Sequence, residues 1–295
     1  MRNTLCTLAF LVALTASAQT PVVSAQWLHA HLNDSDLVLL HVGEKDEYKG
    51  AHIPGARFVS LGDISVMHTE TMMMLEMLSA EELRKHLEAL GISDNSRIVV
   101  YFGKDWVSPS TRVLFTLDYA GLAAHASLLD GGMPAWKKAG EETTNVVPPQ
   151  RIGKLSPLKI NSMIVDADFV RAHLHTNGFA VVDARNASFY DGVETGQSMN
   201  EKHKTGHLPG AKSIPYTSVA TESDLMLKSH AQLEELFTKA GVKPDDTVIG
   251  YCHIGQQATA MLFAARLIGH KVLLYDGSMD DWSTHKDFPT ETSSK

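Results

Sequence analysis

The stretch GAHIPGARFVSL (residues 50–61) returns later in the chain as GHLPGAKSIPY (residues 206–216). The segments around both stretches repeat in the same order: residues 23–43 resemble 165–185, residues 79–102 resemble 229–252, and LLDGGMPAW (128–136) resembles LYDGSMDDW (274–282). Equivalent residues are about 150 positions apart, a period far too long for a solenoid. The chain is therefore expected to contain a duplicated domain.

Each copy alternates short apolar segments with amphipathic ones. In the second copy, TVIGY (247–251) has the composition of a buried strand and ATAMLFAARLIG (258–269) has the spacing of a helix. Ser79 and Ser229 each stand three residues before a glutamate or glutamine, which predicts a capping box at a helix start. Strands that alternate with helices predict an α/β fold with two domains, each a parallel sheet flanked by helices.

One proline-containing segment separates the two copies. TTNVVPPQRIGKLSPL (143–158) contains three prolines and is typical of a linker. We therefore expect a first domain at residues 20–142 and a second domain at residues 159–292.

The N-terminal residues have the three parts of a secretory signal peptide. Arg2 supplies a positive charge, LCTLAFLVAL (5–14) an apolar core and ASA (16–18) a cleavage site. The apolar run is shorter than the roughly 20 residues that a membrane-spanning helix needs. We expect residues 1–18 to be removed and the mature protein to be periplasmic or secreted, without membrane attachment.

Composition restricts the class of partner. Of the 295 residues, 44% are hydrophobic, and the formal net charge is −8. This is the composition of a globular protein, and no cluster of Lys and Arg offers a surface for phosphates. We expect no nucleic-acid partner and look for a small-molecule site instead.

Cys252 is the only cysteine expected in the mature protein, because Cys6 belongs to the signal peptide. A single thiol forms no internal disulfide, so Cys252 is either buried and inert or reactive. It lies between the predicted strand 247–251 and the predicted helix 258–269, where main-chain N–H groups and the helix dipole favour a thiolate nucleophile. The first copy has Phe102 at this position, which predicts a single chemical site in the second copy.

Other thiol chemistries fit this loop less well. Cysteine-dependent phosphatases place an arginine six positions beyond the cysteine, where this chain has Ala258. No C-x-x-C pair occurs, so we expect no metal and no cofactor. Oxidation of Cys252 to a sulfenic acid, as in a redox sensor, is a further alternative.

Several motifs of the sequence belong together. They are the HIPGA and HLPGA segments, DAR at 183–185, the two DG…W closings and the six-residue C-x-x-G-x-x loop. Together these motifs resemble those of the tandem-domain rhodanese family of sulfurtransferases. The resemblance spans nearly the whole mature chain. It implies an inactive N-terminal domain and a catalytic C-terminal domain with its site near their interface. It also implies that Cys252 takes a sulfane sulfur from a donor, becomes a persulfide, and passes the sulfur to cyanide or a thiol.

The resemblance leaves the donor and some residue roles open. Arg185 could steer an anionic donor or form an ion pair with Asp183. His253 could supply a titratable cation near pH 6–7 or merely lie at the rim of the site, and Gln256 and Gln257 could supply neutral donors. The candidate site residues are therefore Cys252, Arg185, His253, Ile254, Gly255, Gln256 and Gln257.

The sequence CHIGQQ has neither the basic residues of family members that prefer thiosulfate nor the glycine–serine pair of those that prefer 3-mercaptopyruvate. Thiosulfate is the expected donor, and 3-mercaptopyruvate is the alternative. A non-catalytic module that binds a partner through the cleft between the domains is the alternative function. The methionine-rich segment 72–78 could bind Cu(I), but we favour an apolar segment that covers the core or the cleft.

Overall fold

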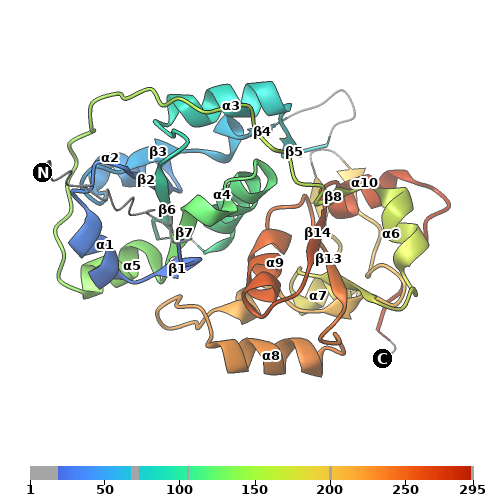
Figure 1. Ribbon diagram of the computed structural model, residues 1–295. Helices are drawn as coiled ribbons and strands as arrows, with labels where there is room; N and C mark the ends of the chain where they lie inside the picture. Colours follow the sequence, from blue (N-terminus) through green and yellow to red (C-terminus); the bar gives the residue numbers. More distant parts are fainter. Residues whose placement is uncertain (1–18, 68–72, 105, 199–200, 294–295) are drawn as a thin grey trace, which may run out of the picture.

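The computed structural model describes residues 19–67, 73–104, 106–198 and 201–293 (Figure 1). The predicted signal peptide, residues 1–18, lies outside these ranges. Within them, no helix combines the length and the apolar character needed to cross a membrane.

The first copy contains a five-stranded sheet in which every pair of neighbouring strands is parallel. The strands, in spatial order, are β1 (Val22–Val23), β7 (Ala126–Leu129), β6 (Arg97–Phe102), β2 (Leu37–Val42) and β3 (Arg57–Val59). The central strands β2 and β6 are buried at five of their six positions. Such continuous apolar strands are typical of a sheet that is covered on both faces.

The second copy contains a parallel sheet with the same strand order. Its strands are β8 (Ile164–Val165), β14 (Val272–Tyr275), β13 (Thr247–Tyr251), β9 (Phe179–Asp183) and β12 (Lys212–Ser213). Each strand matches its counterpart in the first sheet, in chain order as well as in space. The predicted α/β fold with two parallel sheets is therefore confirmed.

Helices cover both sheets. The first copy has α1 (Ala25–His31), α2 (Lys45–Gly50), α3 (Ala80–Ala89), α4 (Ser108–Tyr119) and α5 (Gly132–Lys138). The second copy has α6 (Ala167–His173), α7 (Ala187–Tyr190), α8 (His230–Lys239), α9 (Ala258–Leu267) and α10 (Ser278–Thr284). The predicted cap at Ser229 is a complete capping box with Gln232, and the Ser79 hydroxyl accepts from the N–H of Glu82.

Short elements complete each copy. They are the hairpins β4 (Ser65–Val66) with β5 (Glu76–Met77) and β10 (Gln197–Ser198) with β11 (Glu201–Lys202), and the 3-10 turns η1 (Leu61–Asp63), η2 (Ala123–His125) and η3 (Tyr216–Val219). The methionine-rich segment of the sequence forms part of the first hairpin.

The segment between the two copies has no regular structure over residues 145–161 and runs past α3 (Figure 1). The N–H of Gly153 donates to the carbonyl of Glu88 at 2.7 Å, and the N–H of Leu155 donates to the Glu88 carboxylate at 2.9 Å. Leu155 is buried in the core. The linker is therefore fixed to the first copy, and the predicted boundaries 143 and 158 stay a prediction.

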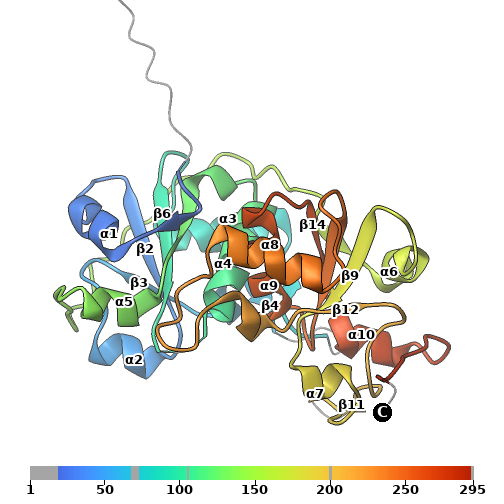
Figure 2. The ribbon, with the colours of Figure 1, turned by 90° about the horizontal axis from the view of Figure 1, so that it is seen from below.

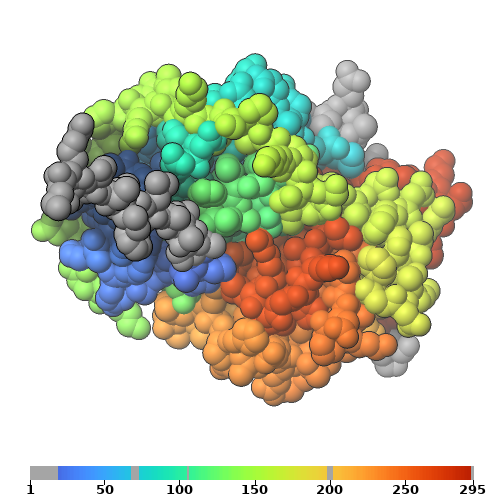
Figure 3. All heavy atoms as spheres, in the orientation of Figure 1, coloured from blue at the N-terminus to red at the C-terminus, as the bar shows by residue number. Residues whose placement is uncertain are grey.

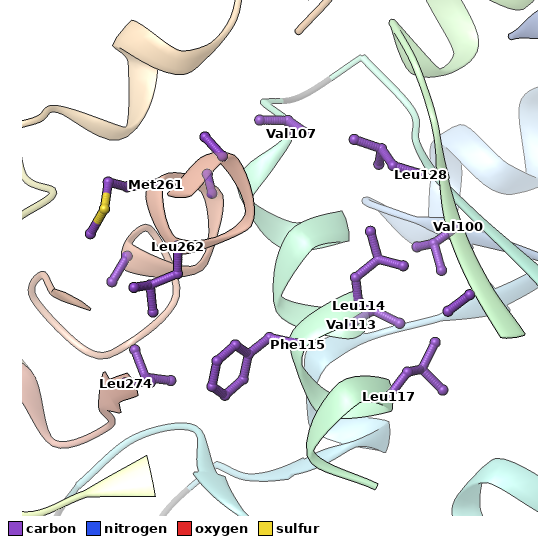
Figure 4. Close-up of a cluster of buried hydrophobic side chains, with 14 of the residues drawn as sticks. Val100, Val107, Val113, Leu114, Phe115, Leu117, Leu128, Met261, Leu262 and Leu274 are labelled. Carbon is purple, nitrogen blue, oxygen red and sulfur yellow. The ribbon is translucent and has the colours of Figure 1, made fainter. Parts of the chain in front are cut away.

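Helices α4 and α9 lie between the two sheets and pack against each other (Figures 1 and 2). In Figure 4, Phe115 of α4 points toward Leu262 and Leu274 of the second copy, whereas Leu114 points toward Val100 of its own sheet. One hydrophobic cluster thus spans both copies. The space-filling view shows the copies as one continuous body (Figure 3). Ten of the twelve residues of α4 are buried, and they include the charged Arg112 and Asp118, so the helix is enclosed on all sides.

Candidate active site

Cys252 follows strand β13 directly and precedes helix α9 by six residues. Its side chain is only 1% exposed, yet it forms part of the wall of a pocket of about 360 Å³. The other residues that line this pocket are Met74, Gln197, His253, Ile254, Gln256 and Gln257. Cys252 therefore borders a pocket that a small molecule could enter, while it also packs in the hydrophobic cluster that spans both copies.

The carbonyl groups and the amide groups of the loop have different environments. The carbonyl oxygens of Cys252, His253, Gly255, Gln256 and Gln257 all accept hydrogen bonds from the surrounding protein. By contrast, the N–H groups of residues 253–258 donate none to any residue that the structure describes. A loop whose carbonyls are turned outward to partners presents its amides to the inside, where they can hold an anion.

The segment after β14 holds the start of this loop. The Cys252 N–H donates to Ser278 Oγ at 3.1 Å, and the N–H of Met279 donates back to the Cys252 carbonyl at 3.1 Å. The N–H of Asp280 donates to the His253 carbonyl, also at 3.1 Å. The segment DGSM (276–279), whose counterpart in the first copy is DGGM (130–133), thus fixes the loop at the site.

Gly255 allows the loop to turn. Its φ angle is +78°, a conformation that side chains with a Cβ rarely adopt. A Cβ at this position would also lie 2.7 Å from the carbonyl oxygen of Asp276. Both the backbone conformation and the close contact therefore require glycine here.

Arg112 of the first copy reaches the loop of the second. This side chain is fully buried, and its Nη1 donates to the Gly255 carbonyl at 3.1 Å and to Asp276 Oδ1 at 2.6 Å. Its Nη2 donates to the carbonyl of Leu75, beside the pocket residue Met74. Arg112 was not predicted as a site residue. The feature that could have indicated it is a charged arginine within the largely apolar segment that forms α4.

Arg185 forms an ion pair instead of lining the pocket. It is 1% exposed, and its Nε donates to Asp183 Oδ1 at 3.0 Å and to Oδ2 at 3.1 Å. Burial opposes its charge, but the hydrogen bonds that it donates to Asp183 and the attraction to Asp183, Tyr251 and Cys252 outweigh burial and raise the pKa of Arg185. Of the two interpretations of Arg185, the structure therefore favours the ion pair.

His253 is neutral at physiological pH. Burial, and then the charges of Arg185 and His203, lower the pKa of His253 to about 4, although Asp280 acts in the opposite direction. The expectation that His253 supplies a cation near pH 6–7 is wrong, because a second positive charge beside Arg185 in a buried site is unfavourable. His203 and Asp280 also escaped the sequence analysis, since they come from separate segments and form no motif.

The remaining predicted residues have distinct positions. Ile254, Gln256 and Gln257 line the pocket, and the buried Gln257 Oε1 has no hydrogen-bond partner among the described residues. Gly255 itself supports the turn. Across the domain boundary, Trp106 contacts Tyr216 edge to face with ring centroids 5.9 Å apart. Among the described residues, no group of three His, Cys, Asp or Glu side chains is placed to hold a metal ion.

The first copy preserves the scaffold of this site without its chemistry. The Tyr251 hydroxyl donates to Asp183 at 2.8 Å, and its counterpart Tyr101 lies 3.0 Å from His41. Phe102 replaces the thiol and is fully buried. Among the described residues, Cys252 in the second copy is therefore the one cysteine thiol.

Comparisons with known proteins agree with this arrangement. The sequence profile of the Rhodanese-like domain matches residues 24–139 and again residues 166–285. The probable 3-mercaptopyruvate sulfurtransferase of Pseudomonas aeruginosa is 32% identical, over 94% of this chain and 99% of that protein. Thiosulfate/3-mercaptopyruvate sulfurtransferase 2 of Arabidopsis thaliana is 28% identical, over 94% of this chain and 88% of that protein.

A solved structure shows the same fold. The anaerobic ergothioneine biosynthesis enzyme from Chlorobium limicola superposes with a TM-score of 0.81 at 23% identity, over 93% of this chain and 71% of that one. With the two profile matches and the relatives named as sulfurtransferases, the chain belongs to the rhodanese-like family, as an enzyme of its sulfurtransferase branch with two such domains in tandem.

Proposed function

We propose that the protein transfers a sulfane sulfur from a small anionic donor to a thiophilic acceptor through a persulfide on Cys252. The observation that carries this proposal concerns the N–H groups of residues 253–258, which have no hydrogen-bond acceptor among the described residues. The carbonyls of the same loop accept hydrogen bonds from the surrounding protein. A persulfide extends one bond beyond Sγ and carries its negative charge on the outer sulfur. Main-chain amides can stabilise that charge without a cationic side chain.

The donor half-reaction needs a leaving group. With thiosulfate, the Cys252 thiolate attacks the outer sulfur, the S–S bond of thiosulfate breaks, and its electron pair leaves on sulfite. A new bond joins Sγ to the transferred sulfur. The charge of Arg185, which interacts favourably with a negative charge on Cys252, supports an anionic sulfur at both stages.

The acceptor half-reaction restores the enzyme. With cyanide, the carbon attacks the outer sulfur, thiocyanate leaves, and the electron pair of the broken bond returns to Sγ as a thiolate. Thiosulfate is the proposed donor because the inward-facing amides of the loop attract an anion. 3-Mercaptopyruvate is also an anion, so it belongs in the same donor panel.

The test is thiocyanate formation from thiosulfate and cyanide, together with the intact mass after exposure to the donor alone. The wild-type protein should form thiocyanate and gain one sulfur, about 32 Da. Cys252→Ser should abolish both, whereas Cys6→Ser in the full chain is the matched control and should abolish neither. Activity that survives in Cys252→Ser, or no mass gain with any donor of the panel, would contradict the proposal.

A further inference from the structure

Three polar side chains form a path that leads from the pocket into the protein. His253 Nδ1 lies 3.5 Å from His203 Nδ1, and His203 Nε2 lies 3.3 Å from Asp280 Oδ1. The side chains of His203 and Asp280 are 2% and 15% exposed, so both are shielded from solvent. His253 alone of the three lines the pocket beside Cys252.

This cluster is poorly explained as a means of stabilising the fold. Asp280 Oδ2 is buried and has no hydrogen-bond partner among the described residues, which destabilises the folded state. Gly196 makes room for the cluster, because a Cβ there would lie 2.7 Å from His253 Nδ1 and 2.9 Å from His203 Nδ1. Buried polar groups kept at such a cost indicate a function.

The hydrogen bonds define the tautomers. An ionised Asp280 only accepts, so His203 carries its proton on Nε2 and has a free lone pair on Nδ1. His253 must then donate through Nδ1, which leaves the lone pair of its Nε2 available. The Nδ1 edge of the His253 ring faces His203 and Gly196, so the Nε2 edge remains for the pocket. The separation of 3.5 Å is the outer limit of a hydrogen bond, and such bonds commonly shorten when substrate binds.

We propose that His253 is the catalytic base that takes the proton of a thiol acceptor, and that His203 and Asp280 are positioning residues that draw this proton away from the pocket. The proposal rests on the proposed function, and it names the acceptor class, a thiol that is protonated at neutral pH. An acceptor thiol that is already ionised has no proton for the base to remove.

The step balances in atoms and charge. The S–H proton of the acceptor moves to His253 Nε2, and the acceptor sulfur attacks the outer sulfur of the persulfide. A bond forms between these two sulfurs, the bond to Sγ breaks, and its electron pair stays on Cys252 as a thiolate. The products are a persulfide of the acceptor and an imidazolium, whose Nδ1 proton passes to His203.

The charges around the relay favour this direction. Burial, and then the charges of Arg185 and His203, lower the pKa of His253, so the imidazole is neutral before the step and holds a received proton only weakly. Asp280 favours the proton, and it contacts His203 and not the pocket. A proton received at the pocket is therefore drawn toward the carboxylate, as a positive charge is drawn to its buried partner.

The test measures discharge of preformed persulfide to two acceptors at neutral pH. N-acetylcysteine is a protonated alkyl thiol, and thionitrobenzoate is an already ionised aromatic thiol. Asp280→Asn and His203→Gln should each slow discharge to N-acetylcysteine by roughly 10²-fold and to thionitrobenzoate by less than about 3-fold. Both variants should still gain one sulfur from the donor, which shows that they fold and load.

Helix α10 provides matched controls. Asp281 and His285 form a second Asp–His pair, at 3.1 Å, away from the pocket residues. Asp281→Asn and His285→Gln should discharge both acceptors at the wild-type rate. Equal slowing with both acceptors in the relay variants, or no slowing with either, would overturn the relay alone. Failure of the wild-type protein to load sulfur would overturn the proposed function and the relay with it.

Discussion

Arg112 in the first domain donates a hydrogen bond to the main-chain carbonyl of Gly255 in the catalytic loop of the second, at 3.1 Å. The domain without a thiol therefore determines the shape of the loop that carries one. The same guanidinium pairs with Asp276, next to the turn that holds Cys252. We therefore expect catalysis in the second domain to depend on a side chain of the first.

Replacing Arg112 should therefore affect turnover as well as stability. Arg112→Met leaves the buried Asp276 carboxylate without its partner, which should lower the free energy of unfolding by about 3–5 kcal/mol. Turnover should fall by at least about 10²-fold, because the loop loses its support. Steady-state thiocyanate formation and urea unfolding would measure the two effects.

The control is another ion pair between the domains, Arg266 with Asp118. Arg266 is half exposed, and the buried Asp118 keeps Asn161 as a partner, so Arg266→Met should lower the free energy of unfolding by less than Arg112→Met does and leave turnover unchanged. Wild-type turnover in a folded Arg112→Met variant would contradict the role assigned to Arg112.

Gly255→Ala should abolish turnover by distorting the loop. The added Cβ would lie 2.7 Å from the Asp276 carbonyl and 2.8 Å from its carboxylate, so the loop must move. Gly140→Ala is the matched control, because Gly140 has φ +79° and no atom within 4 Å of a built Cβ. The control should lose roughly 1 kcal/mol of stability from backbone strain and no activity. Equal activity in the two variants would show that close contact at Gly255 is unimportant.

Acid should destabilise the protein partly through His41. Burial lowers the pKa of His41 from 6.5 to about 4, although Glu47 opposes the shift. Between these values the unfolded chain binds a proton that the folded chain does not. The free energy of unfolding therefore falls as pH decreases, by up to roughly 1.4 kcal/mol per pH unit.

Urea unfolding of the wild type and of His41→Gln between neutral and acid pH would measure this contribution. The difference in stability between the two proteins should shrink as the pH falls, because the variant lacks this titration. His230→Gln, at an exposed position on α8, should retain the full dependence of the wild type. Parallel curves for wild type and His41→Gln would contradict the prediction.

Export should remove the first 18 residues. The signal peptide that the sequence predicts ends at Ala18, so the protein recovered from the periplasm or medium should begin at Gln19. N-terminal sequencing and intact mass after fractionation would decide this. Replacing Ala16 and Ala18 with large residues should retain the uncleaved chain, whereas recovery of full-length wild-type protein in the exported fraction would contradict cleavage.

The repeat made the fold predictable. Strand β13 has the bounds predicted for TVIGY, and the helix predicted from residue 258 begins there, because buried strands and capped helices leave local patterns. The duplication predicted two equivalent sheets, and their strand orders agree. The segment between them carried no such pattern, so its attachment to α3 was not foreseen.

The thiol and its loop were predictable for the same reason, since they are contiguous in the sequence. The supporting residues were not. Arg112, His203 and Asp280 come from three separate segments that only the tertiary fold brings to the loop. The charge state of His253 was mispredicted because burial and Arg185, which sequence spacing does not reveal, determine its pKa.

The burial of α4 on every side has a consequence for dissecting the molecule. One side of this helix packs against α9 in the other half of the chain, and its guanidinium donates to the Gly255 carbonyl and the Asp276 carboxylate of that half. Severing the polypeptide at residues 145–161 would therefore not release a smaller working catalyst. It would yield two fragments with exposed apolar surfaces. The fragment with the thiol would lack the residues that support the loop of Cys252.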